Sequence, residues 1–357
     1  MSFLNLRRIS FLAALAALAL GSGCGTPPKP AQRWAFFPRS PNPPRLQFLT
    51  GFSSDRDLGR DATFTEYLTG QPPDVVQLAK PYGIAIRQGQ IRTCDTSLGA
   101  IEIFDLTKKR ARYFAPRGDG KLSVPINITI DADGTQYITD TGRNQVVIFG
   151  SDDSFVGALG GKDEMKPTDV AITTNRLYVT DLKHSTVRVY DKAEQKLLFT
   201  IPRDPVNDTN RLYQPTNLAL DGQGRLLVSD TGGFRVQIYD TEGHHLRTVG
   251  QQGTAPGYFA RPKGVAAARD GTSYVVDAST QVVQMFDAEG RLLMFFGQPG
   301  ESEAGELVLP AAVKVDYDNL DYFQQFVAPF YRLRYLILVT SQFGPSKVSV
   351  YGFIEKM

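Results

Sequence analysis

The chain has 357 residues, of which 42% are hydrophobic and 21% charged, and its formal net charge is +2. This composition supplies enough apolar residues for a core and excludes an intrinsically disordered chain. The small net charge argues against nucleic acid as a partner, and two cysteines, which allow at most one disulfide, exclude a cysteine-stapled scaffold.

The first 24 residues have the pattern of an export signal. Arg7 and Arg8 precede an apolar stretch, 9–20, that is too short to span a bilayer as a helix. Small residues at 21–23 then lead to Cys24. This arrangement resembles the lipobox of bacterial lipoproteins, which implies that Cys24 is acylated and becomes the mature N-terminus. The alternative is cleavage by an ordinary signal peptidase near Gly23.

The next segment is rich in proline, with seven prolines within residues 25–45. Such a run forms neither a helix nor the interior of a sheet, so we expect residues 25–44 to be an extended spacer ahead of a folded body, residues 45–357. Gly25 stands where, in lipoproteins, an aspartate favours retention in the inner membrane. The resemblance therefore implies an outer-membrane location in a two-membrane bacterium, facing the periplasm or the exterior.

Six prolines mark an internal repeat, at intervals of 42 to 48 residues: Pro81, Pro125, Pro167, Pro215, Pro262 and Pro310. A short, mainly apolar triplet follows each proline three to five residues later, for example Leu218-Ala219-Leu220. A small centre with branched flanks is typical of a strand that is crowded on both sides. A repeat of this length is typical of propeller blades.

An aspartate ends the second apolar run in each of the first five units: Asp95, Asp140, Asp181, Asp230 and Asp277. Nine residues later stands an aromatic residue, with apolar residues at the sixth and eighth positions between them. This alternation of period two predicts a third strand, and a turn with one more apolar run predicts a fourth. The sequence thus predicts an all-β six-bladed propeller of four-stranded antiparallel blades. Because the aspartates recur once per blade, we expect them to cap backbone donors of a neighbouring loop, and not to act as catalytic acids.

Segment 228–240, Val-Ser-Asp-Thr-Gly-Gly-Phe-Arg-Val-Gln-Ile-Tyr-Asp, resembles the signature of NHL repeats, as does segment 138–149. The resemblance covers roughly residues 81–357 and implies the propeller fold, which hosts many functions. The sixth unit lacks a fourth strand of its own, whereas residues 45–51 look like a fourth strand without a blade. We expect this N-terminal strand to complete blade six, since closing the ring removes exposed sheet edges.

The second residue after each marker proline is expected at one mouth of the central channel. Three consecutive units carry oxygen donors at this position: Asn127, Asp169 and Asn217. Carboxylate and amide oxygens are ligands for Ca²⁺, and propeller lactonases, which the chain resembles only in fold, hold a catalytic metal at that mouth. The alternative is that these residues serve turn geometry alone and that no cofactor is bound.

Other catalytic chemistry finds little support. The three histidines, His184, His244 and His245, stand in or beside predicted turns and do not have the spacing of metal ligands. Motifs for a serine nucleophile, a phosphate loop or haem attachment are absent from the sequence. Cys94 has no partner if Cys24 carries lipid, so we interpret it as a small buried apolar residue, with a reactive thiol as the alternative.

Blade six departs from the repeat through an insert of about twenty residues between its first strand, 313–315, and its second, 336–339. The insert is aromatic and contains Tyr322, Phe323, Phe326, Phe330 and Tyr331. One interpretation is a short helix or loop that packs these rings on the propeller and plugs the channel mouth. The other is a knob that binds a partner, because aromatic residues dominate interface anchors.

Together these features predict a monomeric, non-catalytic binding or scaffold propeller that is tethered to the cell envelope through a lipid. Its partner would be an envelope protein or a polysaccharide. The alternative is a metal-dependent, lactonase-like hydrolase or lyase that acts at Asn127, Asp169 and Asn217. RNA binding, which is a function of some NHL-repeat proteins that the chain resembles, disagrees with export and with the small positive charge.

Overall fold

The computed structural model describes residues 34–59, 75–161, 164–204, 207 and 209–357. The predicted signal, Cys24 and residues 25–33 of the spacer lie outside this part of the chain. One compact unit contains residues Trp34–Met357. None of the helices in the described residues has the length and apolar character needed to cross a membrane.

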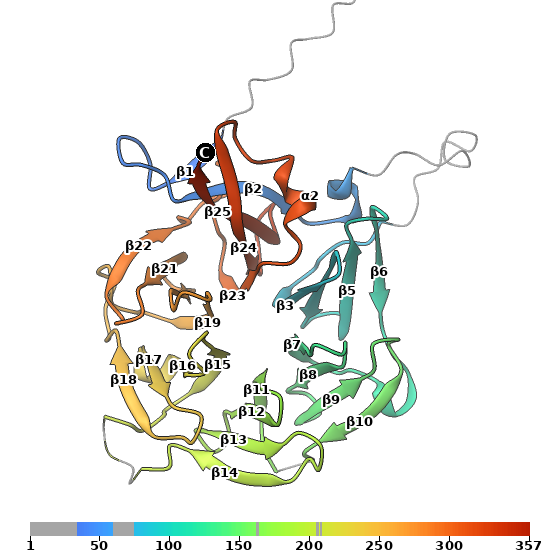
Figure 1. Ribbon diagram of the computed structural model, residues 1–357. Helices are drawn as coiled ribbons and strands as arrows, with labels where there is room; N and C mark the ends of the chain where they lie inside the picture. Colours follow the sequence, from blue (N-terminus) through green and yellow to red (C-terminus); the bar gives the residue numbers. More distant parts are fainter. Residues whose placement is uncertain (1–33, 60–74, 162–163, 205–206, 208) are drawn as a thin grey trace, which may run out of the picture. The chain divides into compact units, whose positions relative to one another are not determined.

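Six antiparallel sheets follow one another around a central axis, as blades of a propeller (Figure 1). Blades one and two contain β3 (Pro81–Arg87), β4 (Gln90–Asp95), β5 (Ala100–Asp105), β6 (Arg110–Phe114), β7 (Pro125–Ile130), β8 (Gln136–Asp140), β9 (Gln145–Phe149) and β10 (Phe155–Leu159). Blades three and four contain β11 (Pro167–Ile172), β12 (Arg176–Asp181), β13 (Thr186–Asp191), β14 (Leu197–Ile201), β15 (Pro215–Leu220), β16 (Leu226–Asp230), β17 (Arg235–Tyr239) and β18 (His245–Val249). Blade five contains β19 (Pro262–Ala267), β20 (Ser273–Asp277), β21 (Val282–Phe286) and β22 (Leu292–Phe296).

Blade six closes the ring with both ends of the described chain. Its strands are β23 (Pro310–Asp316), β24 (Tyr331–Ser341), β25 (Val348–Lys356), β2 (Leu46–Phe52) and β1 (Ala35–Phe37). β2 pairs antiparallel with β25, from Leu46 opposite Phe353 to Phe52 opposite Val348. The predicted completion of blade six by an N-terminal strand is therefore confirmed. The short helices are α2 (Leu320–Gln324) and three 3₁₀ turns, Asp55–Leu58, Gly118–Gly120 and Thr231–Gly233.

The end of the predicted spacer is part of blade six, which corrects the boundary at residue 44. β1 pairs with β2 as a fifth strand, Ala35 opposite Phe48. The ring of Phe37 lies 5.9 Å from that of Tyr351 and 6.2 Å from that of Phe296. Prolines limited this segment to a short edge strand, but they did not prevent its aromatic residues from packing on the blade.

All six inner strands begin at a marker proline, and in every one the register with the second strand shifts just after it. Such β-bulges bend the strand and re-aim the side chain that follows. In this fold the re-aimed side chain is the second residue after the proline. The bulge therefore helps to direct Asn127, Asp169 and Asn217 toward the channel, where the sequence analysis expected them.

The five recurring aspartates are fully buried, and each accepts hydrogen bonds from backbone N–H groups. Asp95, for example, accepts from Ala79 and Lys80 through Oδ2, at 2.9 and 2.6 Å, and from Ser97 and Leu98 through Oδ1, at 2.8 and 3.0 Å. The other four carboxylates accept hydrogen bonds from backbone N–H groups in the same way: those of Asp140, Asp181, Asp230 and Asp277. Each aspartate therefore joins the connector that enters its blade, and in most blades also the turn after its second strand.

Candidate functional site in the central channel

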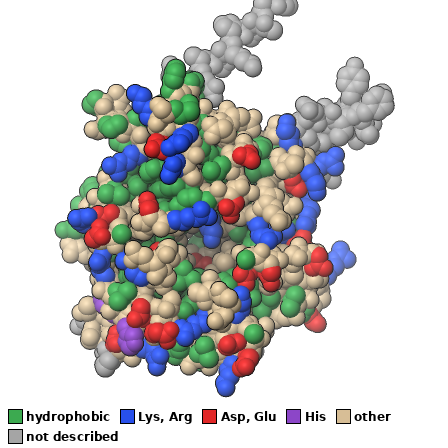
Figure 2. Space-filling model, viewed as in Figure 1, with side chains coloured by type: hydrophobic (Ala, Val, Ile, Leu, Met, Phe, Trp, Pro, Cys, Tyr) green, Lys and Arg blue, Asp and Glu red, His purple; other side chains and the backbone are tan. Residues whose placement is uncertain are grey.

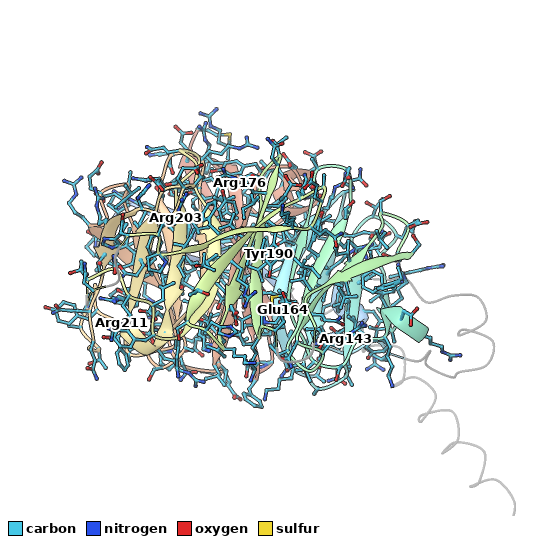
Figure 3. All side chains as sticks on the ribbon, turned by 90° about the horizontal axis from the view of Figure 1, so that it is seen from below. Arg143, Glu164, Arg176, Tyr190, Arg203 and Arg211 are labelled. Atoms are coloured by element: carbon cyan, nitrogen blue, oxygen red, sulfur yellow. The ribbon has the colours of Figure 1, made fainter. Side chains whose placement is uncertain are left out.

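The inner strands β3, β7, β11, β15, β19 and β23 surround a cavity of about 300 Å³ on the axis. It extends along these strands to the turn after β7, where Asp131 and the exposed Ala132 line it. Figure 2 shows the face with this opening as a hollow at the centre of the ring. Figure 3 shows the ring edge-on, with Arg176 and Arg203 toward one face and Arg143 and Arg211 toward the other.

The three predicted oxygen donors, Asn127, Asp169 and Asn217, line one cavity. They are only 5%, 9% and 2% exposed, so they lie at the buried inner end of the cavity and not at its mouth. The other three inner strands have small residues at the same position, the second after the marker proline: Gly83, Gly264 and Ala312. We call these six positions the Asp169 layer. A Cβ on Gly83 would lie 2.5 Å from the Cα of Asn127, so only glycine permits this close approach of two inner strands.

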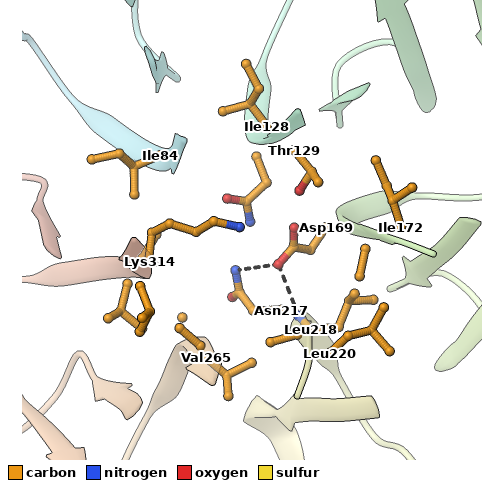
Figure 4. Close-up of a pocket in the computed structure, with 18 of the residues that line it drawn as sticks. Ile84, Ile128, Thr129, Asp169, Ile172, Asn217, Leu218, Leu220, Val265 and Lys314 are labelled. Carbon is orange, nitrogen blue, oxygen red and sulfur yellow. Dashed lines mark hydrogen bonds between the residues drawn. The ribbon is translucent and has the colours of Figure 1, made fainter. Parts of the chain in front are cut away.

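Asp169 is the electrostatic centre of this layer. Its Oδ2 accepts from the backbone of Leu218 at 3.0 Å and from Asn217 Nδ2 at 3.3 Å, and its Oδ1 accepts from the backbone of Val170 at 2.8 Å (Figure 4). Burial raises the pKa of Asp169 to about 7, although these hydrogen bonds and the charge of Lys314 favour the ionised form. The carboxyl group therefore changes its charge near neutral pH.

Lys314, in the middle of β23, is the residue of this cavity that the sequence analysis missed. Figure 4 shows its side chain crossing the cavity toward Asp169. Burial lowers the pKa of its ammonium group, while Asp169 and Asp316 act in the opposite direction. A signal was present in the sequence, because the other five triplets have a small residue at this position: Ala85, Thr129, Ala171, Ala219 and Ala266.

A second lysine approaches the axis from the other side of the Asp169 layer. Lys263 directly follows its marker proline, so it precedes the oxygen donors along the inner strands, whereas Lys314 comes after them. Its Nζ lies 6.0 Å from the centre of the Tyr82 ring. Burial, together with the charge of Arg261, lowers the pKa of Lys263 to about 8.

The cavity residues do not fit a Ca²⁺ site well. Both oxygens of Asp169 already accept hydrogen bonds, and the ammonium group of Lys314 brings a positive charge into the same space. Ca²⁺ takes six to eight oxygen ligands, generally with several carboxylates among them. Among the described residues no group of three or more His, Cys, Asp or Glu side chains is suitably placed for a metal ion.

The remaining chemically active side chains lie away from this cavity. His184 contacts Asp181 at 2.7 Å, His244 contacts Asp204 at 2.9 Å, and His245 contacts Gln237 at 3.0 Å. None of the three lines the central cavity. Cys94 is fully buried and burial raises the pKa of its thiol, which confirms its interpretation as an interior residue.

The aromatic insert packs mainly at the junction of blades six and one. Phe323, on α2, is fully buried in a cluster with Leu58 and Leu78, so its expected place on a partner surface is wrong. Tyr322, Phe326 and Tyr331 are half-buried against the same cluster. The insert does not plug the channel, because its residues 317–330 do not line the cavity. Only Phe330, at 74%, is largely exposed.

No family model matches the chain. Three solved structures share its fold at low identity. A structural genomics protein of unknown function from Bacteroides thetaiotaomicron is 14% identical, with a TM-score of 0.60 over 87% of this chain and 76% of that one. A streptogramin B lyase is 13% identical, with a TM-score of 0.54 over 76% and 93%. A chain from a nidogen/laminin complex is 19% identical, with a TM-score of 0.50 over 63% and 84%.

These similarities and the blade topology define the class: the chain is an all-β, six-bladed propeller of antiparallel blades, closed by a strand from its N-terminal part. Within that class it is a propeller whose axis holds a lysine and an aspartate inside a small cavity. At such identities the similar structures show the fold alone, and they include a lyase as well as a protein in a binding complex.

Proposed function

We propose that this chain is an exported lipoprotein of the NHL-repeat type, anchored through Cys24, whose propeller docks an envelope protein and catalyses no reaction. The observation that supports docking is the tip of blade six. There β24 and β25 have 11 and 9 residues, whereas β3 to β22 have five to seven. Phe330, directly before the first residue of β24, is an exposed aromatic side chain at the end of these long strands.

The blade-six tip, which we define as Phe330, Tyr331, Arg332 and Arg334, has the chemistry of an interface anchor. Phe330 is 74% exposed, while the neighbouring Tyr331 ring packs 5.6 Å from that of Phe36 and holds the base of the tip. Arg332 and Arg334 share one carboxylate, that of Glu355, at 2.8 and 3.3 Å. The tip therefore has one positive charge in excess, and Figure 2 shows basic and hydrophobic side chains gathered over blade six. Aromatic and arginine side chains are enriched among residues that dominate binding energy.

Capture from the envelope tests this role with a matched control in the same hairpin. The lipid-anchored, affinity-tagged chain is cross-linked in cells and purified, as wild type, as Phe330→Ser with Arg332→Ser, and as Phe343→Ser. Phe343 is 49% exposed and lies in the turn at the opposite end of β24. We expect one protein to be captured by the wild type and by the Phe343 variant and lost with the tip variant. Equal capture by all three refutes the tip as docking surface, and captured carbohydrate makes the partner a polysaccharide.

The anchor is tested separately by replacing Cys24 with serine. We expect the wild type in the membrane fraction, released by detergent and not by salt, and the Cys24→Ser chain in the soluble fraction. A serine variant that stays in the membrane fraction contradicts a lipid on Cys24 without affecting the docking proposal.

A hydrolase or lyase that acts in the central cavity is the second candidate. It is supported by the convergence of Asn127, Asp169 and Asn217 in one cavity and by the shared fold with a streptogramin B lyase. The presence of Lys314 beside Asp169 weighs against a metal in that cavity. Lactone and ester screens with added Ca²⁺ or Zn²⁺, together with melting temperatures during Ca²⁺ titration, separate the two candidates. Turnover, or a rise in melting temperature with Ca²⁺, favours the enzyme.

A further inference from the structure

The ammonium group of Lys314 is the one cation among the residues that line the central cavity. Within the described part of the chain it makes no hydrogen bond and no ion pair, although two carboxylates are near enough to act on its charge, those of Asp169 and Asp316. Asp316 is turned toward Asn319, which donates to it from its backbone and its side chain, both at 2.9 Å. A partly buried cation without a partner carries a desolvation cost that an anionic ligand relieves.

The walls around this cation are apolar. The side chains that surround it in Figure 4 are Ile84, Ile128, Ile172, Leu218, Leu220 and Val265. An apolar cavity with a few convergent polar groups is typical of small-molecule sites, and about 300 Å³ is at the small end of their range. A ligand that suits both features has a hydrocarbon body and a charged end.

The acidic groups of the cavity limit that charge to one. Asp169 lies opposite Lys314, and Asp131, paired with Lys192 at 2.8 Å, lines the opening. The charge of Asp131 is offset by Lys192. A dianion such as phosphate or sulfate would face the Asp169 carboxyl group with one cavity lysine to balance it, whereas a monoanion matches that lysine. The acceptor oxygens near the lysine also disfavour a second negative group on the ligand.

From this arrangement we propose that the central cavity is a binding site for a small monocarboxylate with an apolar body, whose carboxylate pairs with the Lys314 ammonium group. The aliphatic side chains of the inner strands hold the hydrocarbon part. Binding at this cavity is independent of docking at the blade-six tip, because the tip residues do not line the cavity.

The test compares acids with amides of the same shape on the wild-type chain. Hexanoate and benzoate are titrated by calorimetry against hexanamide, benzamide, hexylamine and inorganic phosphate. We expect the carboxylates to bind and the amides, the amine and phosphate to bind on the order of 10-fold or more weakly, since a hydrogen-bonded charge pair is lost. Equal binding of acid and amide, tighter binding of the amine, or no binding of either carboxylate at millimolar concentration overturns the proposal.

Two variants assign the effect to one lysine. Lys314→Met keeps the length of the side chain and removes its charge, so carboxylate affinity should fall on the order of 10- to 100-fold while the melting temperature is kept or raised. Lys263→Met is the matched control, because Lys263 is also a partly buried lysine near the axis but lies beyond the Asp169 layer. An equal loss in both variants contradicts a site at Lys314.

Discussion

Replacing Glu102 by glutamine tests the electrostatics of the interior of blade one. Glu102 lies in the middle of β5 with none of its surface exposed. Thr93 Oγ1 donates to its Oε2 at 3.1 Å, and Oε1 is buried without a hydrogen-bond partner among the described residues. Burial, and next the charge of Asp95, raise the pKa of Glu102 to about 9 from an ordinary value of 4.5. The folded chain therefore holds this side chain as a neutral acid at neutral pH.

The size of the effect follows from linkage between protonation and folding. Between pH 4.5 and about 9 the folded state binds one proton more than the unfolded state, so its free energy of unfolding falls as the pH rises. Each pH unit costs ~1.4 kcal/mol, so holding the proton at pH 7 costs about 3 kcal/mol as an upper estimate. Glutamine is neutral at every pH and does not have this cost.

Urea unfolding at pH 5 and pH 7 measures the prediction. We expect Glu102→Gln to be about as stable as the wild type at pH 5 and more stable by about 2 to 3 kcal/mol at pH 7. The reciprocal control is Gln284→Glu, at the same position of β21, where Gln284 donates to the carbonyl of Tyr258 at 2.7 Å. That variant should lose stability increasingly as the pH rises from 5 to 7. A difference between wild type and Glu102→Gln that is the same at both values refutes a raised pKa for Glu102.

Three further substitutions have definite outcomes in the same unfolding assay. Gln47 donates to the carbonyl of Phe326 at 2.7 Å and accepts from the N–H of Ala328 at 2.9 Å. Gln47→Leu leaves both backbone groups without this partner and should lower the free energy of unfolding by about 2 kcal/mol. An unchanged unfolding midpoint contradicts this role. Phe323→Ala should cost about 3 to 5 kcal/mol and a Tyr322→Ala control far less, so equal losses contradict the burial of Phe323. Lys263→Met removes a charge that is costly to bury, so it should stabilise the chain by up to about 2 kcal/mol below pH 8. This gain should shrink as the pH rises toward 10.5, because the lysine of the wild type then loses its charge in the folded and in the unfolded chain. A gain that does not change with pH contradicts the lowered pKa.

The blades were predictable because each strand has a local signature. Inner strands begin at the marker prolines, and the second strands of the first five blades end at the recurring aspartates. Proline cannot donate in a ladder and is tolerated at the first residue of a strand, so its position along the chain predicts a strand start directly. The closing strand was recognisable for a related reason, since a repeat that lacks one strand requires it from elsewhere.

The depth of the channel residues was not predictable to the same degree. Which way Asn127, Asp169 and Asn217 point depends on a bulge after the proline, and a bulge has no signature in a period-two pattern. Lys314 interrupts its triplet visibly, but only the closed ring brings its side chain opposite Asp169.

The composition of the blade-six insert did not predict which of its aromatic residues are buried. Its aromatic residues indicated either packing or binding, and the structure divides them: Phe323 enters the core while Phe330 stays exposed. What decides between the two is contact with Leu58 and Leu78, which lie more than two hundred residues earlier in the chain. No local pattern records such a contact. In β1, likewise, the proline content predicted a spacer, and the packing of Phe37 on Tyr351 determined the outcome.

Blade six also lacks the aspartate that holds the incoming connector in the other five blades. Ser341 stands opposite Pro310, where Asp140 stands opposite Pro125, and it accepts a single long bond, from the backbone of Val308 at 3.4 Å. A neutral hydroxyl that accepts one weak bond replaces a carboxylate that accepts several charge-assisted ones. The ring itself closes through the β2–β25 ladder, and Gln47 adds a side-chain bond to the carbonyl of Phe326; both join segments about three hundred residues apart. A ligand at Lys314 contacts β23 of this same blade, so a ligand that binds only the closed ring stabilises the junction by mass action.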